Sequence, residues 1–490
     1  LLPVPGKTSQ ALATRLGHKY GDRITGCFHL PGREGEYAPF PDDLPPALAA
    51  ALRSRGIERL DFATWNVLIG GRGGNPNDVG VSGKPVYVAP RFGAAYRIDD
   101  NTVFRTGYGV TVNPMPWSRP LRGFYPLTIA FSDTAAGFNF ISTLEQGIPP
   151  IATPDLSTGS VVLPRGVDMR TPNPGNVDRA TLHQWNVTFE RRLPFDLVTS
   201  VAYVGTQNNG GYADINQNYA EPGTGNAGRR YFAQAGNANI LDWGAWTTSK
   251  YHSLQVAVNR PFKNGLLLKG AYTWSKAMNE TDDDGWTGLT WNIPSQYARN
   301  YARAGYDRTH ILQMAFVYEL PFLRDSNSIL AHVVKNWQIN GIFAAFSGTP
   351  FTIGGNNPQL LAPGAGAVTA NQNGDITYIN DPSRDVKWID TSVLSNPSGL
   401  QWGNSGRNAF RGPGQWNLDF SLFKNIPIGR YRIEFRAQRR MIVDLAVEGG
   451  DPAAVGRVHG LAAGRGEVDD RQPAVGKADA SRAVAPHALI

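Results

Sequence analysis

The chain has 490 residues, of which 41% are hydrophobic and 11% aromatic, and it carries a formal net charge of +7. No segment approaches the roughly 18 apolar residues of a spanning helix, which excludes a helical membrane protein but leaves a β-barrel open. The single cysteine, Cys27, excludes a disulfide framework and an all-cysteine metal site. Because lysines and arginines are scattered between residues 61 and 438, the charge indicates a solvated surface and no nucleic-acid partner.

Three compositions follow one another along the chain. Residues 1–60 predict helix and loop, because "PDDLPPALAAALRSRGIERL" has an aspartate cap region, prolines in the first turn, an Ala/Leu stripe and Gly56 as a stop. Residues 61–438 are rich in Gly, Asn, Thr and aromatics and contain repeated segments of period 2. Residues 439–490 contain no Phe, Trp or Tyr, which predicts a separate low-complexity tail, either disordered or translated out of frame.

The middle piece repeats one unit, two alternating strands joined by a turn. In "YHSLQVAVNRPFKNGLLLKGAYTWSK", Leu254, Val256 and Val258 share one face of the first strand, and Leu268 and Trp274 share one face of the return strand. The other units are "PRFGAAYRIDDNTVFRTGYGV", "QWNVTFERRLPFDLVTSVAYVG", "HILQMAFVYELPF" with "WQINGIFAAFSGTPFTI", and "WNLDFSLFKNIPIGRYRIEFRAQ". Together they predict roughly ten strands, each with one apolar and one mostly polar face.

The turns of these units differ from the links between them. Proline marks four of the five turns, at Pro194, Pro261, Pro321 and Pro427, and suits strand ends because it lacks a ladder donor. The links after Val110, Gly205 and Ile353 are long and loop-like. Short turns on one side and long loops on the other are typical of an outer-membrane barrel, with the apolar faces toward lipid and the polar faces toward a lumen. A soluble β-sandwich or solenoid with its apolar faces packed together is the alternative.

Six segments occur in the order found in one family: "APRFGAAYRIDDNTVFRTGYGV", "HQWNVTFERRLPFDLVTSVAYVGTQ", "YHSLQVAVNRPFKNGLLLKGAYTWSKAM", "YDRTHILQMAFVYELPF", "NGIFAAFSGTPFTI" and "FRGPGQWNLDFSLFKNIPI". In this order, residues 85–438 resemble the barrel of TonB-dependent outer-membrane receptors, in particular the Oar-like group common in acidobacteria. The resemblance implies a plugged barrel of roughly 22 strands that takes up a bulky ligand. It also implies three partners, namely outer-membrane lipid, the barrel-assembly machinery and the TonB complex.

Several parts of such a receptor are not recognised in the sequence. We find no signal peptide, TonB-box-like segment, regulatory β-sandwich or plug, and the aromatic-free tail stands where the closing strands should follow Gln438. The expected fold class is therefore mainly all-β: an incomplete antiparallel transmembrane β-barrel with a short helical N-terminal segment and an irregular C-terminal tail. A chain of this kind is not expected to be transport-competent alone.

The N-terminal segment has a different resemblance. "GDRITGCFHLPGREGEYAPFPDDLPPALAAALRSRGIERL" resembles the lead-in of a DEAD/DEAH-box helicase, although no motor motif follows it. "PGKTS" matches only the end of a Walker A pattern and predicts a solvated loop. These features suggest a composite chain, and we expect contiguous sequencing reads to break at Leu60–Asp61 or Gln438–Arg439.

No catalytic, cofactor-binding or metal-ligating residue is assigned. The acidic cluster Glu280, Asp282, Asp283 and Asp284 offers hard oxygen ligands but lacks the spacing of an EF-hand loop, and the histidines form no metal-binding motif. Trp243, Trp246 and Trp286 fit either stacking on a ligand or packing of their own loops. The predicted function is a non-enzymatic receptor barrel in the cell outer membrane, and the alternative is a soluble secreted adhesin or glycan-binding protein.

Overall fold

A computed structural model of the chain describes residues 57–81, 83–84, 86–114, 124–126, 129, 153–282, 288–323, 326, 328–379, 388–428 and 431–445. Antiparallel strands dominate these residues, which confirms the predicted β-rich class. Within the described ranges, no helix has the length and apolar character needed to cross a membrane. The predicted N-terminal helix and most of the predicted tail lie outside these residues.

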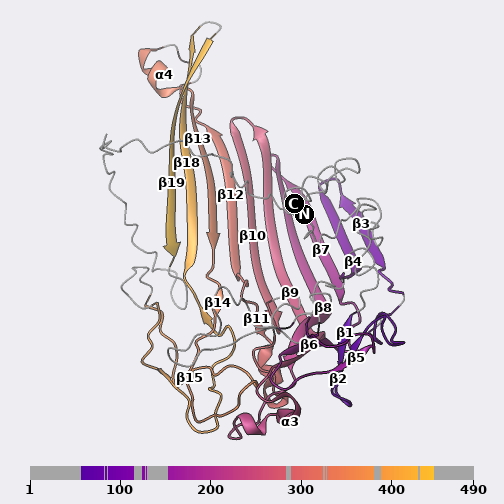
Figure 1. Cartoon of the computed structure of the whole chain (residues 1–490). Helices are drawn as coiled ribbons and strands as arrows, with labels where there is room; N and C mark the ends of the chain where they lie inside the picture. Colours follow the sequence, from indigo (N-terminus) through magenta and orange to yellow (C-terminus); the bar gives the residue numbers. More distant parts are fainter. Residues whose placement is uncertain are drawn as a thin grey trace, which may run out of the picture. The chain divides into compact units, whose positions relative to one another are not determined.

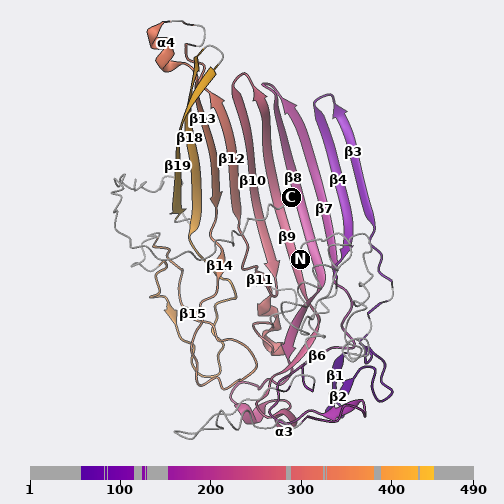
Figure 2. The same ribbon diagram turned by 45° about the horizontal axis from the view of Figure 1, so that its top comes forward.

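Ten strands lie side by side in one sheet, and their order along the sheet is their order along the chain (Figures 1 and 2). They are β3 (Arg91–Asp99), β4 (Thr102–Val112), β7 (Thr181–Leu193), β8 (Leu197–Asn216), β9 (Ile240–Lys263), β10 (Leu266–Asn279), β12 (His310–Glu319), β13 (Trp337–Phe346), β18 (Gly414–Ile428) and β19 (Tyr431–Leu445). Each pairs antiparallel with the next, as expected for strands joined by turns. Within the described residues, β3 and β19 are the two edges of this sheet.

The short turns follow from local sequence. Between β9 and β10, Asn264 and Gly265 have positive φ angles of 51° and 78°, as a two-residue turn that follows the strand twist requires. Pro261 lies within the last residues of β9, and the β9–β10 register shifts between Leu266 and Leu268. A residue without a ladder donor is accommodated at such an irregularity.

The longer link after Pro321 contains the short helix α4 (Ile329–Val334), which lies at the short-turn end of the sheet (Figure 1). Its N-terminus is capped by Ser328, whose hydroxyl accepts the Ala331 N–H at 3.1 Å. At its C-terminus, the Lys424 ammonium of β18 donates to the carbonyls of His332 at 3.0 Å and Val333 at 2.9 Å. This lysine therefore ties the link to the sheet.

The links at the opposite, loop end form smaller elements. The strands there are β1 (Glu58–Asp61), β2 (Asn66–Ile69), β5 (Ser160–Val162), β6 (Met169–Pro172), β11 (Ala302–Arg303), β14 (Pro350–Phe351), β15 (Asn371–Gln372), β16 (Leu394–Ser395) and β17 (Phe410–Arg411). The helices are α3 (Phe232–Ala235) and the 3₁₀ turns η1 (Asn226–Gly228) and η2 (Pro294–Asn300). β6 pairs with the start of β9 and β11 with the end of β10, which joins these links to the main sheet.

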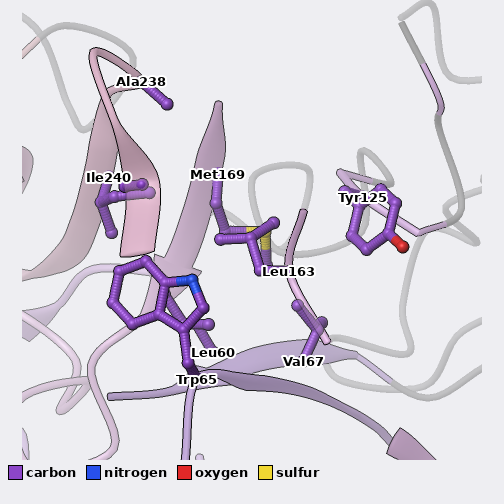
Figure 3. Close-up of a cluster of buried hydrophobic side chains, with 9 residues drawn as sticks. Leu60, Trp65, Val67, Tyr125, Leu163, Met169, Ala238 and Ile240 are labelled. Carbon is purple, nitrogen blue, oxygen red and sulfur yellow. The ribbon is translucent and has the colours of Figure 1, made fainter. Parts of the chain in front are cut away.

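The described hydrophobic clusters all lie at this loop end. One contains Leu60, Trp65, Leu163, Met169 and Ile240, which point toward one another in Figure 3. A second is centred on the stacked rings of Tyr212 and Trp243, and a third on Trp291 and Trp402. From the ten-strand sheet, these clusters include only loop-end residues of β8 and β9. Between these clusters and the short turns, the apolar face of the sheet therefore has no packed core against it in the described part of the chain.

Two described strands extend across limits drawn from composition. Strand β1 runs across the predicted boundary between residues 60 and 61. Leu60, on the N-terminal side of that boundary, is 1% exposed and belongs to the first cluster. β19 continues past Gln438 to Leu445, in register with β18. The folded region described here therefore begins before residue 61 and ends after residue 438.

The predicted long loop after Gly205 is wrong in its extent. Strand β8 continues to Asn216, and β9 already begins at Ile240. The intervening sequence looks like a loop because it is rich in Asn and Gly, but irregularities near Gly211 keep the two strands paired through it. Pairing with a neighbouring strand, which composition does not report, decides this segment.

Candidate functional site

Most of the large apolar side chains of the ten-strand sheet share one face, as predicted, although a few, such as Ile342, lie on the other face. Val256 lies opposite Val201 on one side and Tyr272 on the other, and the next pair along the face places Leu254 opposite Trp274. The face also includes Phe92, Tyr96, Phe104, Val187, Phe189, Leu312, Met314, Phe316, Ile339, Phe343, Leu418, Phe420 and Leu422. Several of these side chains are exposed, with Tyr96 at 68% and Trp274 at 56%. We call this face the apolar wall.

The opposite face is mostly polar. It is lined by Arg97, Arg105, Asn186, Glu190, Ser200, Gln255, Lys269, Thr273, Gln313, Gln338, Asn340, Asn417, Asp419 and Ser421. Arg105 and Glu190 form an exposed ion pair at 3.1 Å across β4 and β7. A face of this kind suits water, so the sheet separates an apolar from an aqueous environment.

Three tyrosine–histidine pairs recur near the loop end of the apolar wall. The hydroxyl of Tyr108 lies 2.8 Å from Nδ1 of His183, that of Tyr203 lies 2.7 Å from His252, and that of Tyr272 lies 2.7 Å from His310. Each pair joins neighbouring strands. The histidines look dispersed along the chain, although "HQW", "HSL" and "HIL" each place a histidine two residues before an apolar-wall residue. That repeated spacing was the available signal.

The three histidines form an inclined row. His183 shares a cross-strand row with Lys250, and His252 lies two residues nearer the short turns than Lys250. His252 shares a row with Lys276, and His310 is opposite Trp274, again two residues nearer the turns. The row thus steps by one residue per strand, an inclination of about 35° at ordinary strand spacings.

The same inclination describes a membrane plane. Strands of a transmembrane barrel tilt by about 35–45°, so a row at this inclination lies level in the bilayer. Roughly ten residues separate each histidine from the short-turn end of its strand, which is the length of a tilted membrane-crossing strand. Trp416 of β18 continues the row after His310. We call the three histidines with their tyrosine partners, together with Trp416, the aromatic girdle.

A polar cavity of about 470 Å³ lies near the loop ends of β8, β9 and β10. Its lining includes Asn208, Tyr212, Ser249, Asn279 and Tyr306. Hydroxyl and amide groups of this kind donate and accept hydrogen bonds without imposing a net charge. Asp282, which also lines the cavity, is paired with Arg407, so the cavity is suited to a polar part of a ligand.

Arg407 organises one wall of this cavity. Its guanidinium donates to a carboxylate oxygen of Asp282 at 3.1 Å, to the Asn279 carbonyl at 2.6 Å and to the Asn300 carbonyl at 3.1 Å. Burial lowers the pKa of Arg407, and the neighbouring Asp282 opposes that shift. Burial also raises the pKa of Tyr306. This network fixes the ends of β10 and η2 around the cavity.

The described members of the predicted acidic cluster bind protein groups. A Glu280 carboxylate oxygen accepts the Thr248 N–H at 2.6 Å, and Asp282 accepts the Gly305 N–H at 2.7 Å in addition to pairing with Arg407. Asp283 and Asp284 lie outside the described residues. Within the described ranges, no three His, Cys, Asp or Glu side chains gather as a metal site.

Two of the three predicted loop tryptophans, Trp243 and Trp246, lie within strand β9, so their assignment to a loop is wrong. Trp243 is 1% exposed and stacks on Tyr212 with ring centroids 4.8 Å apart, so it packs its own region. Trp246 donates its indole N–H to the Asp242 carbonyl at 3.3 Å. Trp286 lies outside the described residues. Of the two interpretations left open by the sequence, packing is correct for Trp243.

The buried carboxyl of Asp242, beside Trp243, should make the stability of the fold depend on pH. Burial raises the pKa of this carboxyl from 3.8 to about 6, although Asn173 and Gln217 donate hydrogen bonds to it. The folded state therefore keeps a proton that the unfolded state loses, so stability should fall between about pH 4 and 6 and then level off. The total loss should be on the order of 3 kcal/mol.

The measurement is chemical unfolding of the detergent-solubilised chain at several pH values, followed by tryptophan fluorescence. Asp242→Asn should flatten the decline between pH 4 and 6. Glu221→Gln, at an exposed position of the same region, serves as the matched control and should leave the decline in place. A decline of the same size in the Asp242→Asn variant would contradict this assignment.

The ten-strand sheet, its apolar wall and the inclined girdle define a class of protein, the transmembrane β-barrel. A model of the family described as "Outer membrane beta barrel domain" matches residues 48–439, and the chain belongs to this family. No curated protein matches the chain. Family membership places the chain in the outer membrane, which confirms the predicted location. The apolar wall is then the face that suits contact with lipid.

Three solved structures are similar to the chain. The ferric-catecholate import receptor Fiu from Escherichia coli K12 shares 10% identity, with a TM-score of 0.31, over 71% of this chain and 29% of that chain. The outer membrane transporter YddB from Escherichia coli shares 7% identity, with a TM-score of 0.35, over 72% and 39%. The FrpB iron transporter from Neisseria meningitidis shares 10% identity, with a TM-score of 0.30, over 68% and 32%. The chain thus spans well under half the length of each.

Proposed function

We propose that the chain forms part of the barrel wall of an outer-membrane receptor of the TonB-dependent type, which takes up a bulky ligand. The observation that carries the proposal is the polar cavity at the loop end of the sheet. Its hydroxyl and amide lining suits a ligand recognised through many hydrogen bonds. The polar face of the sheet, between the cavity and the short turns, would line the aqueous path.

The proposal includes the partners and the chemistry. Energy would come from an inner-membrane TonB complex, and the barrel-assembly machinery would insert the wall into the membrane. The role is binding and passage without chemical change of the ligand, so no residue is given a catalytic role. The Oar-like type of receptor and the helicase-like character of residues 1–60 stay predictions from the sequence.

The test is ligand binding to the full chain in detergent, with a ferric catecholate complex and a linear oligosaccharide as two polar probes. Ser249→Trp places a large side chain at the cavity and should weaken binding of the preferred probe at least tenfold, which is roughly 1.4 kcal/mol. Gln255→Trp, on the same strand but outside the cavity lining, is the control and should bind normally. Binding that both variants retain equally would contradict a ligand site in the cavity.

A further inference from the structure

Two lysines stand on the apolar wall just beyond the aromatic girdle. Lys276 of β10 lies directly opposite His252 of β9, and Lys250 lies two residues nearer the loops than His252 on the same face. All three side chains are exposed. Strand geometry places directly opposed Cβ atoms about 5 Å apart and diagonal neighbours about 7–8 Å apart, so the two ammonium groups and the imidazole form one patch.

The two lysines of this patch have no ion-pair partner in the part of the chain that the structure describes. Glu280, the first acidic residue after β10, accepts the Thr248 N–H and pairs with neither lysine. Two ammonium groups held as diagonal neighbours repel each other, and an anion bound between them would relieve that repulsion.

The level of the patch identifies the anion. The girdle marks the outer boundary of the apolar band, so side chains one step nearer the loops meet the headgroups of the outer leaflet. Two residues nearer the short turns on the same face, Trp274 is 56% exposed and Leu254 is 38% exposed. A phosphorylated lipid has a phosphate group that would meet the lysines and an acyl chain that would meet these apolar side chains.

His252 adds a directed contact. Its Nδ1 lies 2.7 Å from the Tyr203 hydroxyl, and its ring stacks on Tyr203 and contacts Trp185, with centroids 6.1 and 6.0 Å apart. These contacts fix the ring beside Lys276. Its Nε2 has no hydrogen-bond partner among the described residues and is available to a phosphate oxygen.

We propose that Lys250, His252 and Lys276 bind the phosphorylated headgroup of an outer-leaflet lipid, whose acyl chain lies along Leu254 and Trp274. The lysines supply charge and the histidine supplies a hydrogen bond. This site is on the opposite face of the sheet from Gln255 and Lys269, so it does not depend on the receptor function proposed above.

The experiment uses the full chain in a neutral detergent and native mass spectrometry to count bound lipid. The probes are bisphosphorylated lipid A, the same lipid after phosphatase treatment, and inorganic phosphate. The unaltered chain should retain lipid A, bind the dephosphorylated lipid weakly, and show no competition by millimolar phosphate. The double variant Lys250→Gln/Lys276→Gln should weaken lipid A binding by roughly tenfold to thirtyfold, as expected for the loss of two lysines near a lipid phosphate.

Two further variants separate charge from folding. Lys250→Arg/Lys276→Arg keeps both charges and should retain the lipid, whereas Lys269→Gln removes a lysine of β10 from the polar face and should leave binding unchanged. Addition of salt to the unaltered chain should weaken binding as well, a test that needs no variant. Equal lipid A binding by the Gln/Gln variant and the unaltered chain, or salt-independent binding, would overturn the proposal.

Discussion

Arginine in place of Val256 should lower the stability of the membrane-inserted wall by about 2–4 kcal/mol, because a charge at mid-bilayer depth on the lipid side loses its hydration. Val256 lies between His252, at the girdle, and Lys263, at the short turn, with Tyr272 and Val201 as its cross-strand neighbours. The substitution therefore puts a guanidinium in the apolar band.

The control is the next residue along the same strand. Gln255 pairs with Thr273 and Ala202 on the polar face, so Gln255→Arg should change the stability by under about 1 kcal/mol. The measurement is the fraction of chain recovered in the outer membrane in a heat-modifiable form, together with chemical unfolding in lipid vesicles. Equal losses for the two variants would show that the faces are assigned wrongly.

The depth of a position in the bilayer sets how much a charge there costs. From sequence alone, Val256 and Leu268 are equivalent positions on the apolar wall. In the structure, Leu268 is two residues from the start of β10 and lies opposite Arg260, whose guanidinium donates to the Phe195 carbonyl at 3.0 Å. Because the cost of a charge falls toward the interface, Leu268→Arg should cost less than Val256→Arg.

Removal of Arg411 should destabilise the loop-end region by about 3–5 kcal/mol, since it leaves a buried carboxylate unpaired. The Arg411 guanidinium pairs with Asp307, whose side chain is 1% exposed, and it also donates to the Gly348 carbonyl at 2.8 Å and the Thr309 hydroxyl at 2.6 Å. Asp307 in turn accepts the Ala277 N–H at 2.7 Å. One cation thus joins β10, the start of β12 and the β14–β17 pair.

The matched control is an exposed pair at the other end of the sheet. Lys263 and Asp196 lie 2.8 Å apart with side chains 57% and 43% exposed, so Lys263→Met should cost under about 1 kcal/mol. Both variants are measured by chemical unfolding in detergent. If Arg411→Met acts by leaving the buried Asp307 carboxylate unpaired, adding Asp307→Asn should recover part of the lost free energy of unfolding. A double variant less stable than Arg411→Met would contradict this explanation.

The amino-acid sequence by itself determined the two faces of the sheet and its short turns. Side chains alternate along any strand, so Leu254, Val256 and Val258 share a face whatever their partners are. Asn264 and Gly265 adopt the turn that their own backbone preferences favour. These are local properties, and the β-rich class and the outer-membrane location followed from them together with the resemblance in segment order.

Only the tertiary structure brought distant residues together. His183, His252 and His310 belong to three separate segments, and they form one row because hydrogen-bonded register sets where each strand stands against its neighbours. The same holds for Lys250 beside Lys276, and for Arg411 beside Asp307. Register depends on pairing across long loops, and a shift of one residue would turn each of these side chains to the other face, so periodicity within one strand cannot specify it.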